Sequence, residues 1–321
     1  MPSITIGSAK VATGAKGVGE LRIATAMDGR DTCIPVGVVK GAKSGPTVLI
    51  EGGLHGIEIA TIAICRRLLE LLDPSLIAGT VILAPQLNPW AFNASMRHTP
   101  QDLQDMNRVF PGNQGTTLSY QVARVVSEQL IELADYVVDC HSCNPPSLHF
   151  TIVGVEGNDQ TQQQSIEMAK AFGYPIVRAG TNYQGTLSGY CMEIGKPTIT
   201  PEFVFSRRLE SVSIETGTIG ILNVLRHLGM LGGDIEPVEV PGAFPEIRSY
   251  QSVSALKGGV CYFTKDCGDL VNRGETIAEL RTIWGELVDT VASPVDGIVI
   301  AYPLQANQAV MTGDKVAYIA S

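Results

Sequence analysis

The sequence has few charged and few aromatic residues, and its positive charges do not cluster. Charged residues make up 17% and aromatic residues 6% of the 321 positions, whereas hydrophobic residues make up 45%, with a mean hydropathy of +0.16. This balance excludes a disordered chain and predicts a packed globular protein. The net charge of −9 and the lack of a Lys/Arg cluster argue against nucleic acid as a partner, because phosphate neutralisation requires clustered cations.

Long uninterrupted apolar segments are also missing. The first 17 residues contain no apolar core of a secretory signal, so we expect a cytoplasmic protein. The most apolar run, residues 57–72, is interrupted by four charged side chains, which argues against a membrane span and against a membrane partner. The seven cysteines are an odd number scattered along the chain, and this pattern predicts free thiols rather than a disulfide framework.

Short apolar segments rich in Val and Ile alternate with stretches of helical period. The predicted strands are Thr47–Glu51, Gly79–Pro85, Tyr136–Cys140, Leu148–Val153 and Pro197–Phe203, and the predicted helices are Glu58–Leu72, Ser119–Ala134, Gln160–Phe172 and Glu215–Leu228. This alternation indicates an α/β fold with a parallel or mixed sheet flanked by helices. Ligands in such sheets bind at the carboxyl ends of the strands.

The pattern changes after about residue 233, where a connection rich in Gly and Pro leads into short segments separated by Gly-Asp and Asp-Gly turns. We therefore expect a catalytic domain over residues 1–235 and a small all-β domain over residues 236–321. The second part resembles the lipoyl/biotinyl barrel-sandwich family, with Ser-Pro-Val-Asp-Gly-Ile-Val at residues 293–299. Carrier domains of that family present a modifiable lysine on a hairpin. The corresponding segment Trp284–Pro294 contains none, so a carrier function is not expected.

The chemistry is concentrated where the first predicted strand ends. Two glycines follow that strand and allow a sharp turn, and His55 and Glu58 come next, three positions apart. A histidine and a carboxylate with this offset can point at one centre. The pair alone is a weak signal, but its place at the carboxyl end of a strand favours a metal site.

A catalytic zinc ion needs a third protein ligand and keeps one open position. The chain has five histidines. His98 lies in a polar loop, His149 within a predicted strand and His227 late in an amphipathic helix. His141 ends another strand and follows Asp139, whose carboxylate could orient His141 or the neighbouring ligand. His141 is therefore the best third candidate.

Several motifs occur in an order that resembles the succinylglutamate desuccinylase/aspartoacylase family of zinc carboxypeptidase-like hydrolases. They are His55-Gly56-Ile57-Glu58, Asn88-Pro89-Trp90-Ala91-Phe92, Asn107-Arg108-Val109-Phe110-Pro111-Gly112 and Asp139-Cys140-His141. The resemblance covers about residues 45–235, and it also fits the β-rich C-terminal part. It implies a carboxypeptidase-like fold and one zinc ion held by His55, Glu58 and His141.

The resemblance also implies roles for four further residues. Glu202 matches the catalytic glutamate, which passes a proton from water to the leaving amine. Asn107 and Arg108 match the pair that holds the substrate carboxylate, and Arg97 matches the arginine that polarises the scissile carbonyl. Two features depart from the family pattern: the segment between Arg97 and Asn107 is longer than in aspartoacylases proper, and Ile57 stands where Asn or Asp is common.

The leading prediction is a zinc-dependent hydrolase that removes an N-acyl group from an amino acid or a similar amine. Two alternatives stay open at this point: a carboxypeptidase that acts on short peptides, and a binding protein that kept the fold without catalysis. The predicted partner is a small anionic substrate, and a homo-oligomer is compatible with the sequence.

Overall fold

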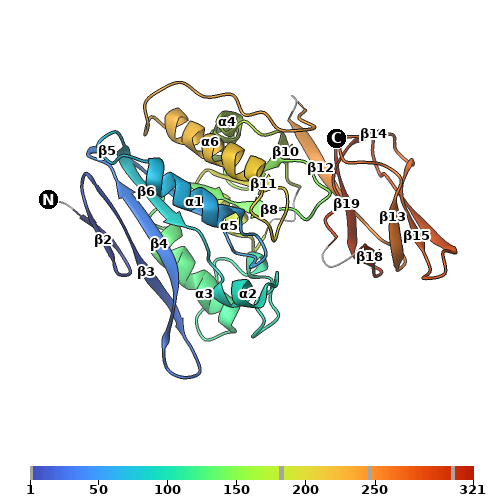
Figure 1. Ribbon diagram of the computed structural model, residues 1–321, viewed down its shortest axis with the longest axis horizontal. Coiled ribbons are helices and arrows are strands. Elements are labelled where there is room, and N and C mark those ends of the chain that lie inside the picture. The colour runs from blue at the N-terminus through green and yellow to red at the C-terminus, as the bar shows by residue number, and fades with distance from the viewer. Residues whose placement is uncertain (1–2, 181–183, 245–246, 305–307) are drawn as a thin grey trace.

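The computed structural model describes residues 3–180, 184–244, 247–304 and 308–321. One long mixed sheet runs through the molecule, with helices packed against its central part and a β-rich region at the C-terminal end (Figure 1). The strands are β1 (Ser3–Ile6), β2 (Ala9–Ala12), β3 (Ala15–Thr25), β4 (Asp31–Lys40), β5 (Lys43–Glu51), β6 (Ala78–Ala84), β7 (Tyr136–Asp139), β8 (His141–Ser142), β9 (Phe150–Val153), β10 (Ile176–Arg178), β11 (Thr198–Phe203), β12 (Arg248–Ser254), β13 (Gly259–Phe263), β14 (Leu270–Val271), β15 (Thr276–Arg281), β16 (Leu287–Ala292), β17 (Gly297–Ala301), β18 (Ala309–Val310) and β19 (Lys315–Ala320). The helices are α1 (Ala60–Leu71), α2 (Pro89–Ala94), α3 (Leu118–Val126), α4 (Asp159–Phe172), α5 (Leu187–Glu193) and α6 (Ser211–His227), with a 3-10 turn η1 (Met106–Arg108) and a π-helical turn η2 (Ser127–Ile131).

The centre of the sheet is parallel and buried on both faces. β5 pairs in parallel with β6 on one side and with β7 on the other, and β7 pairs in parallel with β11. Successive residues of β5 face opposite sides: Val48 and Ile50 join the core with α1, α4 and α6, whereas Leu49 joins the core with α3 and α5. The Val/Ile-rich segments are thus two-sided core strands, and the α/β fold with a helix-flanked mixed sheet is confirmed.

Every strand and helix predicted from the sequence is present, with ends shifted by a few residues. β5 begins at Lys43 instead of Thr47, and the helix predicted to end at Ala134 is α3 to Val126 followed by η2 to Ile131. α6 begins at Ser211 instead of Glu215. Glu210 caps this helix, because its carboxylate accepts hydrogen bonds from the backbone N–H groups of Val212 and Ser213. No helix in the described ranges is long and apolar enough to cross a membrane.

Two regions add strands to this frame. Residues 3–40 form β1 to β4, for which the sequence pattern gave no prediction, and β4 pairs antiparallel with β6. At the other end, β12 pairs in parallel with β10 and antiparallel with β19, so the main sheet continues into the C-terminal strands. A second sheet of order β16-β15-β13-β18 packs over a separate apolar core there, which includes Ile277, Leu280 and Tyr302.

His149, just before β9, is a buried histidine that does not belong to the His55, Glu58 and His141 cluster. Its Nε2 lies 3.0 Å from Ser213 Oγ, its ring meets Tyr174 edge-on, and it is 4% exposed. Burial lowers the pKa of His149 to about 4. The unfolded chain therefore binds a proton at this position below a pH of about 6.5, whereas the folded chain does not bind it until about pH 4.

We expect this difference to make the fold sensitive to acid. Between pH 6.5 and 4, His149 should remove about 3 kcal/mol from the free energy of unfolding, at about 1.4 kcal/mol for each pH unit. His149→Gln cannot titrate, yet it keeps a polar group for Ser213. Urea unfolding at several pH values should therefore show a shallower acid loss in His149→Gln than in the wild type, and parallel curves would contradict this prediction.

Candidate metal centre

A sharp turn after β5 places the first two candidate ligands. Gly52 packs so closely on α1 that a Cβ there would lie 2.4 Å from the Thr61 hydroxyl, and Gly53 has a positive φ of 62°. The chain then turns through His55 and Glu58. The backbone N–H of Glu58 donates to the His55 carbonyl at 3.0 Å and closes this turn. The Gly-Gly pair is therefore required by space and by backbone conformation, as its position after a strand indicated.

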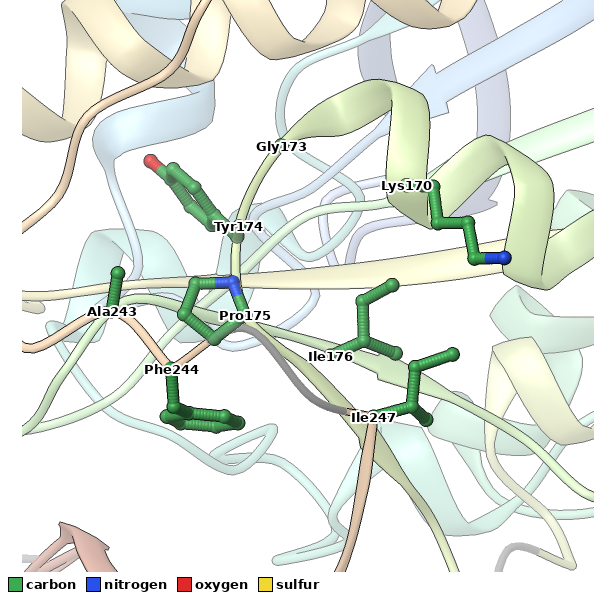
Figure 2. A pocket seen from close by; sticks show the side chains of 8 residues that line it. All are labelled: Lys170, Gly173, Tyr174, Pro175, Ile176, Ala243, Phe244 and Ile247. Atoms are coloured by element: carbon green, nitrogen blue, oxygen red, sulfur yellow. The ribbon is translucent and has the colours of Figure 1, made fainter.

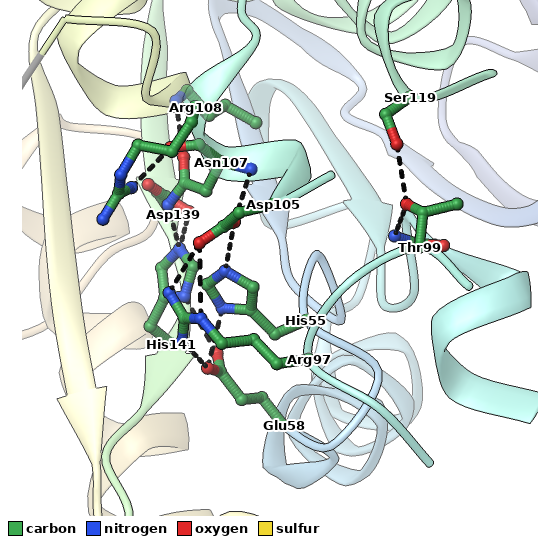
Figure 3. Close-up of polar contacts among 12 residues, drawn as sticks. His55, Glu58, Arg97, Thr99, Asp105, Asn107, Arg108, Ser119, Asp139 and His141 are labelled. Atoms are coloured by element: carbon green, nitrogen blue, oxygen red, sulfur yellow. Dashed lines mark hydrogen bonds and ion pairs between the residues drawn. The ribbon is translucent and has the colours of Figure 1, made fainter. Parts of the chain in front are cut away.

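The third candidate ligand comes from the next strand of the sheet. His141 begins β8, and Glu202 of β11 is its neighbour in parallel register. His55, Glu58 and His141 are all buried, and one ligand atom from each lies within 4.8 Å of the others (Figure 3). The structure thus brings together the three residues that the sequence suggested, from two segments more than 80 positions apart.

The chemistry of these side chains fits a metal cation. His55 Nδ1 lies 2.8 Å from Glu58 Oε1, and His55 Nε2 lies 3.0 Å from Asp105 Oδ1. A neutral imidazole has a single N–H, so one of its nitrogens would face a carboxylate with its lone pair. His141 Nδ1 likewise lies 2.9 Å from Glu58 Oε2. A cation among these atoms would satisfy both imidazoles and the carboxylate, as in the His₂Glu zinc sites of hydrolases.

The electrostatics of the cluster agree with this reading. Burial alone would raise the pKa of Glu58, but the two imidazoles outweigh burial and hold the Glu58 pKa well below its usual value. Burial would lower the pKa of His141, but Asp139 and Glu58 raise it well above its usual value. The site therefore holds an anion that attracts positive charge, whether the charge is a proton or a metal ion.

Two outer carboxylates contact the histidines on the sides away from Glu58. The sequence left open whether Asp139 orients His141 or the neighbouring ligand. Asp139 Oδ1 lies 3.0 Å from His141 Nε2, so Asp139 is the partner of His141. Asp105 takes the same place for His55, and sequence analysis gave it no role. Burial would raise the pKa of Asp105, but His55 and Arg97 outweigh it and hold that pKa well below its usual value. Outer carboxylates of this kind fix the orientation of a metal-binding imidazole.

A fifth carboxyl group lies behind Asp139. Glu51, the last residue of β5, is fully buried, and neither of its oxygens has a donor partner among the described residues. Burial and the neighbouring Asp139 carboxylate raise the pKa of Glu51 well above its usual value. A neutral Glu51 can donate to Asp139, which two charged carboxylates could not do for each other.

Arg97 approaches the cluster from the loop after α2. Its Nη2 donates to Asp105 Oδ2 at 3.1 Å, and its Nη1 lies 3.7 Å from Glu58 Oε1. The long segment between Arg97 and Asn107 is held in place by Asp102, which accepts from the backbone N–H and the hydroxyl of Ser119 at 2.7 and 2.9 Å. The extra length therefore forms an ordered loop that also supplies Asp105.

Asn107 and Arg108 lie in η1 beside His141. The Asn107 side chain accepts from the backbone N–H of Leu187 at 2.8 Å, and its Nδ2 lies 3.2 Å from His141 Nε2. This amide therefore joins two segments next to the metal centre. Arg108 is exposed; its Nη1 donates to the Asn107 carbonyl at 2.5 Å, which leaves other guanidinium N–H groups for a ligand.

Glu202 lies on the same edge of the sheet as His141. The Glu202 side chain is partly exposed. Cys143, the residue directly after β8, is one of its neighbours. Burial raises the pKa of Glu202 to about 7, with Glu58 adding a further upward effect. A carboxyl group with a pKa near neutrality suits an exchange of protons in both directions.

A separate cavity of about 400 Å³ lies where the end of α4 meets β10 and the chain that leads to β12 (Figure 2). Its wall is formed by Lys170, Gly173, Tyr174, Pro175, Ile176, Ala243, Phe244 and Ile247. These residues include none of the candidate ligands or catalytic groups, so the cavity is not part of the candidate site.

Comparison with known proteins agrees with the geometry. Residues 44–228 match the model of the succinylglutamate desuccinylase/aspartoacylase catalytic domain. The chain belongs to this family. Every candidate residue lies inside the matched range: His55, Glu58, Arg97, Asn107, Arg108, His141 and Glu202.

A curated relative and several solved structures resemble nearly the whole chain. N-alpha-acetyl-L-2,4-diaminobutyric acid deacetylase of Halomonas elongata is 29% identical over 302 residues, which cover 89% of this chain and 85% of the relative. A family member from Rhodobacter sphaeroides is 26% identical, with a TM-score of 0.84 over 98% of both chains. The product-bound ectoine utilization protein of Ruegeria pomeroyi shares the fold at 24% identity, with a TM-score of 0.84 over 97% of both chains.

Proposed function

We propose that this chain is a zinc-dependent deacylase that hydrolyses the amide bond of a small N-acyl amino acid. The observation that carries the proposal is the buried His55, Glu58 and His141 cluster, with Glu202 in register beside it on the sheet edge. The name of the Halomonas relative, a deacetylase of an N-acetyl amino acid, supports the substrate class.

The residues around the cluster supply the remaining steps. When bound, zinc would supply a Lewis acid that lowers the pKa of a water molecule and polarises a carbonyl group. Arg108 would bind the substrate carboxylate through two parallel hydrogen bonds. Arg97, anchored through Asp105, would donate to the carbonyl oxygen as negative charge develops on it. Glu202 would accept the proton of the attacking water and deliver it to the leaving nitrogen.

A substrate panel tests this proposal. Zinc-loaded protein is assayed with N-acetyl, N-succinyl and N-formyl amino acids, with short peptides and carboxamide derivatives as contrasts, and the released amine is measured. We expect hydrolysis of at least one N-acyl amino acid and loss of that activity with a chelator. Its carboxamide should react about 10-fold to 100-fold more slowly in kcat/KM, because a charge-assisted contact contributes about 1.5–3 kcal/mol.

The two alternatives give different results in the same panel. Cleavage of short peptides without cleavage of N-acyl amino acids would identify a carboxypeptidase. Saturable binding of panel members by the zinc-loaded protein, without any turnover, would identify a binding protein. Either result would overturn the proposed function.

A further inference from the structure

A row of polar side chains lies behind the metal centre, at the carboxyl ends of the central strands. Glu51 of β5 and Asp139 of β7 are partners in the parallel register of these two strands. Register partners of neighbouring strands lie about 4.8 Å apart and point to the same face of a sheet. Thr200 of the next strand, β11, donates its hydroxyl to Asp139 Oδ2 at 3.4 Å. The sheet itself therefore holds Glu51 against Asp139.

Both carboxyl groups are shut off from water. Glu51 and Asp139 are each 0% exposed. Neither Glu51 oxygen has a hydrogen-bond partner among the described residues, because two carboxylates can only accept. Two adjacent carboxyl groups at this depth cannot both be charged, since each charge disfavours the other. One of the pair must keep a proton.

The surroundings decide which of the two carboxyl groups keeps the proton. Burial raises the pKa of Glu51 well above its usual value, and the charge of Asp139 adds to this effect. Burial would also raise the pKa of Asp139, but His141 outweighs burial and holds that pKa below its usual value. Glu51 therefore carries the proton, and its hydroxyl can donate to the charged Asp139.

The hydrogen bond from Glu51 bears on a candidate ligand through Asp139. Asp139 Oδ1 lies 3.0 Å from His141 Nε2, as Figure 3 shows. The other ring nitrogen, Nδ1, lies 2.9 Å from Glu58 Oε2 within the candidate metal centre. A carboxylate that accepts the Nε2 proton leaves the Nδ1 lone pair for a cation, and it also fixes the plane of the ring.

We propose that Glu51 is a positioning residue of the metal centre, which donates a hydrogen bond to Asp139 and thereby fixes the His141 ring. The inference rests on the proposed function for the metal that His141 would bind. Without this donor, the side of the Asp139 carboxylate that faces Glu51 would be charged, buried and unpaired. The end of β5 thus contributes an acid that holds its neighbour in place and does not itself touch the substrate.

Infrared difference spectra test whether Glu51 carries the proton. Glu51→Gln removes the carboxyl group and keeps a donor for Asp139. A protonated carboxyl group absorbs at a higher frequency than a carboxylate. At about pH 8, far above the usual glutamate pKa of about 4.3, zinc-loaded wild type minus zinc-loaded Glu51→Gln should show the band of a protonated carboxyl group.

Glu215→Gln is the matched control for the spectra, because it makes the same change at an exposed position of α6. This variant should lose a carboxylate band instead of a protonated one. Loss of a carboxylate band in Glu51→Gln as well would show that Glu51 is charged and cannot donate, and it would overturn the inference.

Zinc affinity tests whether the donor acts on the metal centre. Glu51→Met has a side chain of similar length without a donor, and it should bind zinc about 10-fold more weakly than the wild type in competition with a chelator. Glu51→Gln keeps the donor and should stay within about 3-fold of the wild type. Wild-type affinity in Glu51→Met, or an equal loss in both variants, would overturn the inference.

The two measurements separate this inference from the proposed function. Neither needs turnover, so a wild type that binds zinc and hydrolyses nothing would overturn the deacylase proposal and leave both readouts in place. A wild type that binds no zinc would overturn the proposed function and the positioning role together. If Glu51→Met does not fold in urea-unfolding controls, the spectra of wild type and Glu51→Gln still decide whether Glu51 is the donor.

Discussion

Replacement of Glu202 by glutamine is expected to lower kcat by about 10²-fold to 10⁴-fold without loss of metal. Glutamine keeps the size and polarity of the side chain, but it cannot accept a proton from water and return it to the leaving nitrogen. Glu202 is not one of the three clustered ligands, so the metal content should stay at the wild-type value. The measurement is kcat for the best panel substrate, together with zinc content by elemental analysis.

Glu215→Gln is the matched control, because it makes the same change at an exposed position of α6. It should leave both kcat and zinc content unchanged. If Glu202→Gln kept kcat within about 10-fold of the wild type, a different group would have to act as the base. Loss of zinc in Glu202→Gln would instead indicate that this carboxylate helps to bind the metal.

The same residue should set the acid side of the pH profile. Burial raises the pKa of Glu202 to about 7, and only the deprotonated carboxylate can accept a proton. Activity should therefore rise with pH through the pKa of this group. A bound dication adds positive charge nearby and lowers that pKa, so kcat/KM of the zinc-loaded enzyme should fall off on the acid side at or below pH 7.

The parts of this protein that sequence could predict are local ones. The central strands are predictable because burial on both faces demands unbroken Val/Ile runs such as that of β5. The pair His55 and Glu58 is predictable because both residues belong to one turn, which two glycines mark. The proximity of His141 to His55 and Glu58 could be predicted only from their places at strand ends, since parallel strands bring their carboxyl ends to one edge of the sheet.

The parts that sequence could not predict depend on distant contacts. Asp105 meets His55 across 50 positions, and nothing in the segment around Asp105 points to an imidazole. In the sequence, Glu51 is a single acidic residue at the end of an apolar strand. Nothing in that segment predicts that it lies next to Asp139. The turns and alternation of the C-terminal segment indicate a β-rich region, but only distant contacts dock it on the rest of the chain, such as the pairing of β12 with β10 and the hydrogen bond from the Leu148 N–H to the Ile300 carbonyl at 2.8 Å.

Loss of one clustered ligand should have the most severe effect on the metal. The wild type should contain about one zinc per chain, and His141→Ala should weaken zinc binding by more than about 100-fold, because even loss of an outer partner costs about 10-fold to 100-fold. The reason is geometric: His141 supplies one of three ligand atoms that lie within 4.8 Å of one another, and alanine leaves two. Activity should fall with the zinc content.

A graded series separates a ligand from a mere neighbour. Asp105→Asn keeps the three ligand side chains but weakens the carboxylate contact to His55 Nε2, so its zinc affinity should fall only by about 10-fold to 100-fold. His227→Ala removes an exposed histidine at the end of α6 and should leave zinc binding unchanged. Competition with a chelator measures all three variants on one scale. Full zinc retention by His141→Ala would exclude it as the third ligand, whereas an equal loss in His227→Ala would show that the assay reports nonspecific binding.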